Sequence, residues 1–152
     1  MKSDRDPMDE RTENQMADAN DFNTRIIEEF RANDGVVGGP FEGATLVLLS
    51  TIGAKSGQTR VNPVMCRIEG DRLFVFASNA GMPPNPNWYH NVVADSRVTV
   101  ELGDEEFEAV ASVVTGRERD RVFAAHAEQF PNFNEYQEGL DRVIPVVAID
   151  RS

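Results

Sequence analysis

Apolar and polar positions alternate along the chain in a pattern that predicts about six strands. Residues 44–51 form a continuous apolar run with branched side chains, which is typical of a strand buried on both faces. The other strands are predicted at residues 59–68, 72–77, 96–102, 105–114 and 144–149. Short turns at residues 69–71 and at Gly103-Asp104 join two of the pairs and indicate antiparallel hairpins.

Helices are predicted where apolar residues recur at helical spacing. The first covers residues 22–33, and two more are predicted over residues 87–94 and 117–129. The second helix follows a proline-rich loop and has Asn85 or Asn87 as its candidate N-cap.

Together these elements predict a mainly β fold of the α+β class with helices at its edges. Strands joined by tight hairpins favour a closed or split antiparallel β-barrel over a parallel α/β sheet. Residues 1–20 are acidic and carry almost nothing apolar, so we expect a mobile leader without a core of its own. Residues 21–152 then form a single barrel domain.

Composition narrows the class of protein. The formal net charge of -11 over 152 residues argues against a nucleic-acid partner, because phosphate binding needs a basic face. The single cysteine, Cys66, rules out an internal disulfide, and its strand position predicts a small buried side chain. No cluster has metal-ligand spacing, no apolar run is long enough to span a membrane, and the N-terminus is too polar for a signal peptide. We therefore expect a cytoplasmic protein without a metal site.

The loop between the first two predicted strands is the first candidate site. Gly53 and Gly57 allow a tight turn, and Lys55, Ser56 and Arg60 supply donors around it. Exposed N–H groups in such a turn can form a nest for an anion, while Lys and Arg grip a phosphate or carboxylate. This combination suits a phosphorylated cofactor tail. The alternative is a hairpin tip whose cations are merely solvated.

A second candidate site follows the third predicted strand. Small residues at residues 77–81 leave room for a flat ring, which Trp88 and Tyr89 could wall and Asn91 could hydrogen-bond. The alternative is that Trp88 is part of the core. His90 is expected on the helix surface, and His126 has no partner evident from the sequence.

Phe130, Phe133 and Tyr136 form the third candidate site. Their three-residue spacing can place them on one face, where they would line an apolar pocket. They could equally cap the core.

Three ordered motifs resemble one known family. They are TIGAKSGQTRVNPV at residues 51–64, ASNAGMPPNPNWYHN at residues 77–91, and FPNFNEYQEGLDRVIPVVAID at residues 130–150. They resemble the deazaflavin-dependent nitroreductases, also described as F420H2-dependent quinone reductases, over residues 22–150. The resemblance implies a split β-barrel like those that bind FMN, with reduced coenzyme F420 as the cofactor.

The resemblance also assigns residues to roles. It implies that Lys55 and Arg60 bind the anionic tail of the cofactor. The other residues implied to contact the cofactor are Ala54, Ser56, Val61, Asn62, Pro63, Val64, Met65, Phe76, Ala77, Ser78, Asn79, Asn87, Trp88, Tyr89 and Asn91. Phe130, Phe133 and Tyr136 are implied to bind the substrate, and Ser78 and Tyr136 are the candidate catalytic residues.

Three positions depart from the family pattern. Asn79 stands where a nitroreductase of the family has lysine, which removes one cationic contact to the tail. Phe130 and Phe133 stand where that member has tyrosines, which keeps an apolar pocket but removes two hydroxyls. The family's acceptors include quinones, nitroaromatics and unsaturated lactones, and the phenylalanines argue against nitroimidazole activation.

The sequence therefore predicts an oxidoreductase that passes a hydride from reduced F420 to a quinone-like small molecule. Ser78 and Tyr136 would steady the developing oxyanion or supply a proton. Two alternatives remain: an FMN-binding split-barrel oxidoreductase, and a non-enzymatic carrier or sensor of F420. No protein partner is inferred. Peripheral membrane contact through the first helix remains an option, since quinones reside in membranes.

Overall fold

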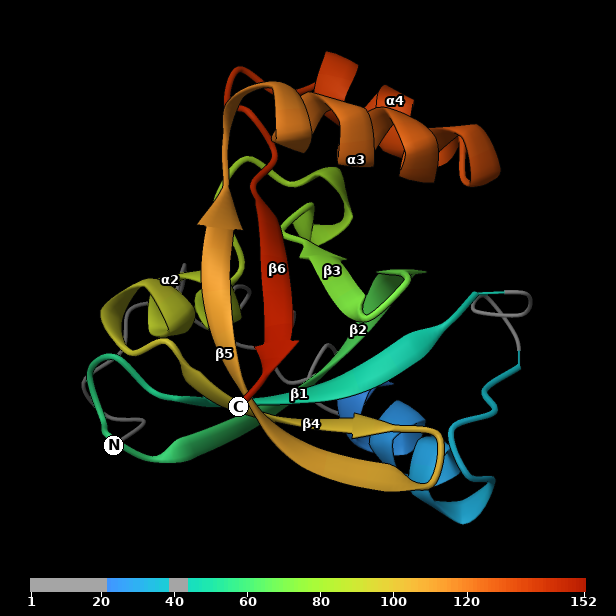
Figure 1. Cartoon of the computed structure of the whole chain (residues 1–152), viewed down its shortest axis with the longest axis vertical. Coiled ribbons are helices and arrows are strands. Elements are labelled where there is room, and N and C mark those ends of the chain that lie inside the picture. The colour runs from blue at the N-terminus through green and yellow to red at the C-terminus, as the bar shows by residue number, and fades with distance from the viewer. Residues whose placement is uncertain (1–21, 39–43) are drawn as a thin grey trace, which may run out of the picture.

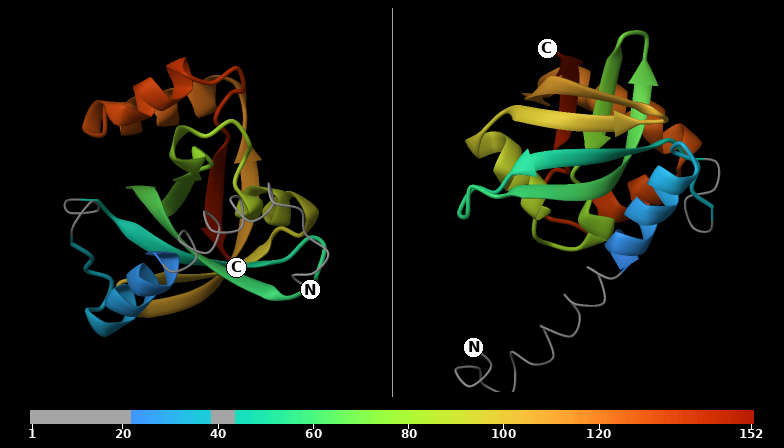
Figure 2. Two further views of the ribbon diagram at one scale, coloured as in Figure 1. Left: turned by 180° about the vertical axis from the view of Figure 1, so that it is seen from behind. Right: turned by 90° about the horizontal axis from the view of Figure 1, so that it is seen from below.

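A computed structural model of the protein describes residues 22–38 and 44–152. The leader predicted for residues 1–20 lies outside the described residues. Figures 1 and 2 show a barrel with helices on its outside. No helix of the described residues is both long enough and apolar enough to cross a membrane.

Six antiparallel strands close into one barrel in the order β1-β2-β3-β6-β5-β4. This confirms the predicted fold class. The strand bounds are β1 Leu46–Ile52, β2 Thr59–Glu69, β3 Arg72–Phe76, β4 Arg97–Leu102, β5 Glu105–Val114 and β6 Val146–Arg151. Both predicted hairpins form, with Glu69 paired to Arg72 and Leu102 paired to Glu105.

The last strand begins two residues later than predicted, at Val146. The preceding residues are held by side chains rather than by strand pairing. The Ile144 N–H donates to the Gln137 side chain at 2.8 Å, and the Ile144 carbonyl accepts from Arg119 at 2.8 Å. These bonds occupy the backbone groups of Ile144 and place its apolar side chain, 0% exposed, in the core.

Strand residues divide into an inner and an outer face. Val47, Leu49, Val75 and Val147 face inward and pack with one another in the barrel core. Cys66 is also buried there, as predicted, and burial raises the pKa of its thiol to about 12. The thiol therefore stays protonated and behaves as a small apolar group.

Helices cover two parts of the outer face. Residues 22–32 form a helix whose Ile26 and Phe30 pack on Leu46 and Leu48 of β1. On the other side, α3 (Gly116–Gln129) and α4 (Asn132–Glu138) lie next to each other and cover outward residues of β3, β5 and β6. Figure 2 shows these two coverings at different ends of the molecule.

Two short elements were not predicted as helices: α4, and the single turn η3 (Asn79–Gly81). The helix α2 (Asn87–Ala94) has its predicted bounds, but the predicted asparagine cap is wrong. Pro86 occupies the N-cap position, and no side chain caps the helix. The Asn85 carbonyl oxygen of the side chain instead accepts a hydrogen bond from Arg142 at 2.7 Å.

Candidate functional site

The outer face of β2 joins the predicted cofactor segments. Val61 and Met65 point outward from this strand, and Met65 packs against both the helix of residues 22–32 and the α3–α4 layer. Val64 points the other way, into the barrel core. Residues 61–65 of β2 were predicted to line the cofactor ring. Because side chains alternate along a strand, only every second side chain faces the site, and the other residues can contribute only their backbone groups.

The loop at residues 53–58 is held by its own hydrogen bonds. Gly53 N–H donates to the Gln58 carbonyl and Gly57 N–H to the Gly53 carbonyl, both at 2.8 Å. Gln58 N–H donates to Ser56 Oγ at 3.2 Å, and Ala54 N–H to Asn91 Oδ1 at 2.9 Å. The predicted backbone nest is therefore wrong at these four N–H groups, because each already has a partner. Within the described residues, the Lys55 and Ser56 N–H groups and the side chains of the loop are left for an anion.

Asn91 ties this loop to α2. It is 7% exposed, and its Nδ2 donates to Thr51 Oγ1 at 3.0 Å while its Oδ1 accepts from Ala54. Hydrogen bonds from the Asn91 side-chain amide thus connect the first candidate site, the loop of residues 53–58, to the second, which includes α2. A further contact between Asn91 and the cofactor remains a prediction.

The rest of α2 divides between core and surface. Trp88 is 5% exposed and packs inside the barrel, so its core interpretation is the one the structure shows. Tyr89 is half-buried beside that core. Asn87 and His90 are exposed, and His90 lies on the helix surface as expected.

Lys55 and Arg60 are exposed, and neither forms an ion pair within the described residues. Other arginines of this acidic chain do have carboxylate partners: Arg72 pairs with Asp150, Arg97 with Asp95 and Arg121 with Glu69. The two cations that the sequence assigned to an anionic tail thus remain available for one.

The turn after β3 has an unusual backbone. Asn79, Ala80 and Gly81 follow one another with φ of 51°, 53° and 82°, in the left-handed region. Asn79 stabilises the turn because its Nδ2 donates to the Pro84 carbonyl at 2.9 Å. Asparagine tolerates this conformation better than lysine does, so the departure at position 79 has a local structural reason.

Arg142 holds this turn in place, and sequence reasoning missed it. Its guanidinium donates to four backbone carbonyls and to the Asn85 side chain at 2.6 to 3.1 Å. The carbonyls belong to Ala77, Ser78, Met82 and Pro83. Burial lowers the pKa of Arg142. Nothing in the sequence distinguishes this arginine from the chain's other arginines, since its partners lie about sixty positions away.

Tyr136 lies against the same turn. A Cβ built on Gly81 would come within 2.8 Å of Tyr136 Cδ1, so the ring rests on the glycine backbone. Tyr136 thus packs on the turn that begins at Ser78, the other candidate catalytic residue. Ser78 is half-buried at the N-cap of η3, and its hydroxyl makes no capping hydrogen bond.

The three predicted aromatics separate by depth. Phe133 is 4% exposed in the outer core, whereas Phe130 and Tyr136 are half-buried at its margin. Phe133 contacts Tyr136 edge-on with ring centroids 5.6 Å apart, and contacts Phe76 at 5.8 Å. Phe133 therefore caps the core, whereas the lining of a pocket by Phe130 and Tyr136 remains a prediction.

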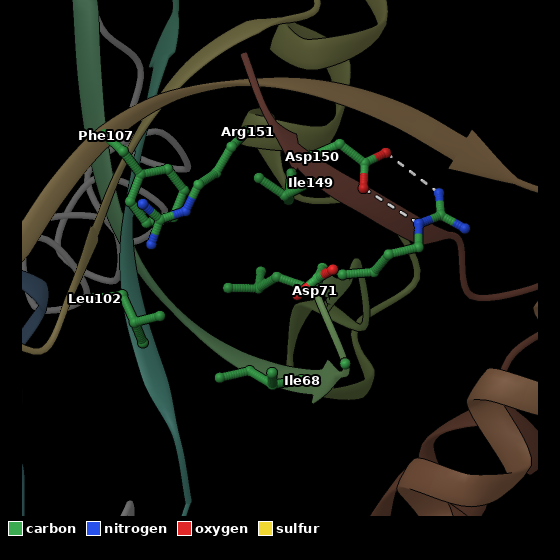
Figure 3. A pocket seen from close by; sticks show the side chains of 10 residues that line it. Ile68, Asp71, Leu102, Phe107, Ile149, Asp150 and Arg151 are labelled. Carbon is green, nitrogen blue, oxygen red and sulfur yellow. Dashed lines mark hydrogen bonds and ion pairs between the residues drawn. The ribbon is translucent and has the colours of Figure 1, made fainter.

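A separate cavity of about 580 Å³ lies at the opposite end of β3, where that strand begins (Figure 3). Ile68, Leu102, Phe107 and Ile149 line it, and the Arg151 guanidinium stacks 3.9 Å over the Phe107 ring. None of the predicted site residues lines this cavity. It is therefore distinct from the candidate site.

Replacing Gly53 with alanine tests the loop. The new methyl group would lie 2.6 Å from Ser56 Oγ and 3.1 Å from the Gln58 carbonyl. We expect the free energy of unfolding to fall by about 1–2 kcal/mol, measured in urea, because the loop must open to admit it. Gly38→Ala is the control, since nothing lies within 4 Å of that position. Equal stability of the two variants would contradict the packing argument.

The fold and site define a split-barrel protein with a cationic loop, an apolar strand face and an aromatic margin. The model of the F420H(2)-dependent quinone reductase family matches residues 23–150. The chain belongs to this family. It is an oxidoreductase that uses coenzyme F420.

Individual relatives agree. The F420H(2)-dependent quinone reductase Rv1261c of Mycobacterium tuberculosis (strain ATCC 25618 / H37Rv) is 33% identical over 126 residues, covering 80% of this chain and 85% of that protein. The structure of an F420-H2 dependent reductase, FDR-A, is 38% identical with a TM-score of 0.64, covering 69% of this chain and 93% of that one. A structure described as a domain-swapped dimer is 34% identical with a TM-score of 0.66, covering 95% and 100%.

Proposed function

We propose that the protein reduces a quinone-like acceptor bound between the outer face of β2 and Tyr136. Nitroaromatics and unsaturated lactones are the other classes of acceptor that we propose for the same site. One observation carries the proposal. Lys55 and Arg60, which pair with no carboxylate of the described residues, lie in the loop before β2 and at its start. The apolar outer face of this strand leads to the turn that bears Ser78. A ligand with an anionic tail and a flat ring would fit this arrangement, with the tail at the two cations and the ring on the apolar face of the strand.

The donor set suits coenzyme F420. Lys55 and Arg60 would hold its phosphate and carboxylate groups, with the Ser56 hydroxyl nearby. Val61, Pro63 and Met65 would lie along its ring, with Phe76, Ala77 and Ser78 at one border and Tyr89 with Asn91 at another. Trp88, Val64 and Asn79 would act indirectly, since the first two pack in the barrel core and the third braces the turn.

When bound, reduced F420 supplies a hydride. The protein would orient the cofactor and the acceptor, exclude water from the site and stabilise the negative charge that forms on the acceptor. The Ser78 and Tyr136 hydroxyls would donate hydrogen bonds to an acceptor oxygen as it gains negative charge. A proton can then reach that oxygen from either hydroxyl or from water.

A titration tests the cofactor and the reaction together. Purified protein is titrated with F420 and separately with FMN while fluorescence quenching is followed, and menadione is then added to the complex with reduced F420. We expect saturable F420 binding and rapid oxidation by menadione. Tight FMN binding without an F420 response would favour an FMN oxidoreductase. F420 binding without oxidation by any of several acceptors would favour a carrier or sensor.

Tyr136→Phe tests the acceptor side of the site. The variant keeps the ring on Gly81 and removes only the hydroxyl, so we expect F420 affinity to stay unchanged. We expect kcat for menadione reduction to fall roughly 10- to 100-fold, because one donor to the oxyanion is lost. Stopped-flow oxidation of F420H2 measures it. An unchanged kcat would remove Tyr136 from the proposal.

Membrane contact is limited by how the first described helix packs. Ile26 and Phe30 are 7% and 1% exposed against the barrel, while Phe22 is 40% exposed. We therefore propose at most a peripheral contact near Phe22, with a small-molecule acceptor as the partner of the site.

A further inference from the structure

His126 is a buried histidine whose ring nitrogens lack protein partners. It lies on α3 with 1% of its surface exposed, and no described residue hydrogen-bonds its Nδ1 or Nε2. Buried donors and acceptors in folded proteins nearly always have partners, so an exception calls for a reason. An apolar side chain of similar size would fill this space without leaving polar groups unpaired.

Three aromatic rings surround the imidazole. The Phe76 ring stacks on it with centroids 4.1 Å apart and an interplanar angle of 13°. Phe133 meets it edge-on at 4.6 Å, and Phe130 lies tilted at 5.0 Å. Phe130 and Phe133 are residues assigned to the acceptor, and Phe133 also contacts Tyr136. The imidazole thus contacts two of the residues assigned to the acceptor.

Phe130 is the outward member of this cage. Phe76 and Phe133 are each 4% exposed, whereas Phe130 is half-buried at the joint between α3 and α4. Phe130 belongs to neither helix, since its backbone has left helical geometry, with φ of -128° and ψ of 82°. As the most exposed of the three rings, Phe130 is the one that an acceptor would have to displace to reach the imidazole.

The imidazole is neutral at the pH at which the enzyme is assayed. Burial, together with the smaller effect of the positive charge of Arg67, lowers the pKa of His126 to about 4. A neutral imidazole keeps one N–H donor and one acceptor nitrogen. Such a group can polarise a carbonyl and stabilise the oxyanion that forms from it.

We propose that His126 is an acceptor-binding residue, whose N–H donates to a carbonyl oxygen of a quinone-type acceptor that displaces the Phe130 ring. It would take the place of hydroxyls that Phe130 and Phe133 lack. This rests on the proposed function. The hydride adds two electrons and one hydrogen to the quinone, the His126 N–H stabilises the resulting hydroquinone anion, and water supplies the second proton.

His126→Phe separates this role from a structural one. The phenyl ring keeps the stack on Phe76 and removes the unpaired nitrogens, so we expect the melting temperature to rise by about 3–6 °C. We expect kcat/KM for menadione to fall about 10-fold, with F420 affinity unchanged. A variant that is less stable, or one that is as active as wild type, would overturn the proposal. His90→Phe makes the same change at the exposed histidine and serves as the control.

Nuclear magnetic resonance gives a readout apart from activity. The chain has two histidines, so protein labelled with ¹⁵N-histidine gives one set of ring signals each for His90 and His126. Menadione is added to protein saturated with oxidised F420. We expect the His126 ring signals to shift and those of His90 to stay. Shifts confined to His90, or none at saturating menadione, would overturn the proposal.

The wild-type reaction distinguishes the two levels of inference. If wild-type protein does not oxidise F420H2 with menadione, the proposed function fails and the His126 proposal fails with it. If wild-type protein does so and Tyr136→Phe slows it while His126→Phe does not, only the His126 proposal fails.

Discussion

Arg142→Ala is expected to lose most of the activity and much of the stability. The guanidinium donates five hydrogen bonds to the segment of residues 77–85. Its removal leaves four carbonyls without this donor and frees a turn that already holds three left-handed residues. We expect the free energy of unfolding to fall by about 3 kcal/mol. We expect kcat/KM to fall by about 100-fold, because Ser78 is no longer held in place.

Urea denaturation and stopped-flow F420H2 oxidation measure these effects. Arg142→Lys keeps the charge but has a single nitrogen, which cannot reach five oxygens, so we expect it to recover only part of the activity. Arg117→Ala is the control, since Arg117 is an exposed arginine in the first turn of α3. An Arg142→Ala protein that matches this control in both measurements would show that the turn is held by other contacts.

The double variant Lys55→Ala, Arg60→Ala is expected to bind F420 about 100-fold more weakly. Each lost contact between a cation and an anionic oxygen is worth about 1.5–3 kcal/mol before solvent screening, and both side chains are exposed. We expect kcat at saturating cofactor to change little, because the proposal assigns these residues to the tail of the cofactor and not to its ring. We also expect the wild-type dissociation constant to rise with salt and that of the variant to respond less.

Fluorescence titration at two salt concentrations measures this. Arg97→Ala is the matched control: Arg97 is exposed but already pairs with Asp95 at 2.7 Å. Unchanged F420 affinity in the double variant would remove the tail assignment, while leaving the acceptor side of the site to be judged by Tyr136→Phe.

The amino-acid sequence determined the strands, the hairpins and the class of fold. Period-two patterning, helical spacing and turn residues are local signals. Strand patterning predicted β5, and helical spacing after a proline-rich loop predicted α2, each with the bounds that the structure has. The ordered motifs predicted the family and the cofactor, which the family match confirms. These features depend on residues close together in the chain, and therefore they can be inferred from it.

The tertiary structure alone decided how the site is held. Asn91 reaches the loop at Ala54 across 37 positions, and Arg142 reaches the turn across 57 to 65. Trp88 lies in the core because α2 packs over the interior of the closed barrel. The residues next to Trp88 in the sequence do not reveal this packing. Four of the loop's N–H groups were predicted to bind an anion but already have partners, and that depends on how the chain returns on itself.

For His126, too, the sequence determined one part of the description and the tertiary structure the rest. Apolar residues at helical spacing predicted the helix α3, and the structure places His126 on its buried face. The sequence could not show that its nitrogens lack partners or that Phe76 and Phe130 surround it, because Phe76 comes from a strand fifty positions earlier. Periodicity determines which residues are buried, and only the packed barrel and helices determine what each buried group touches.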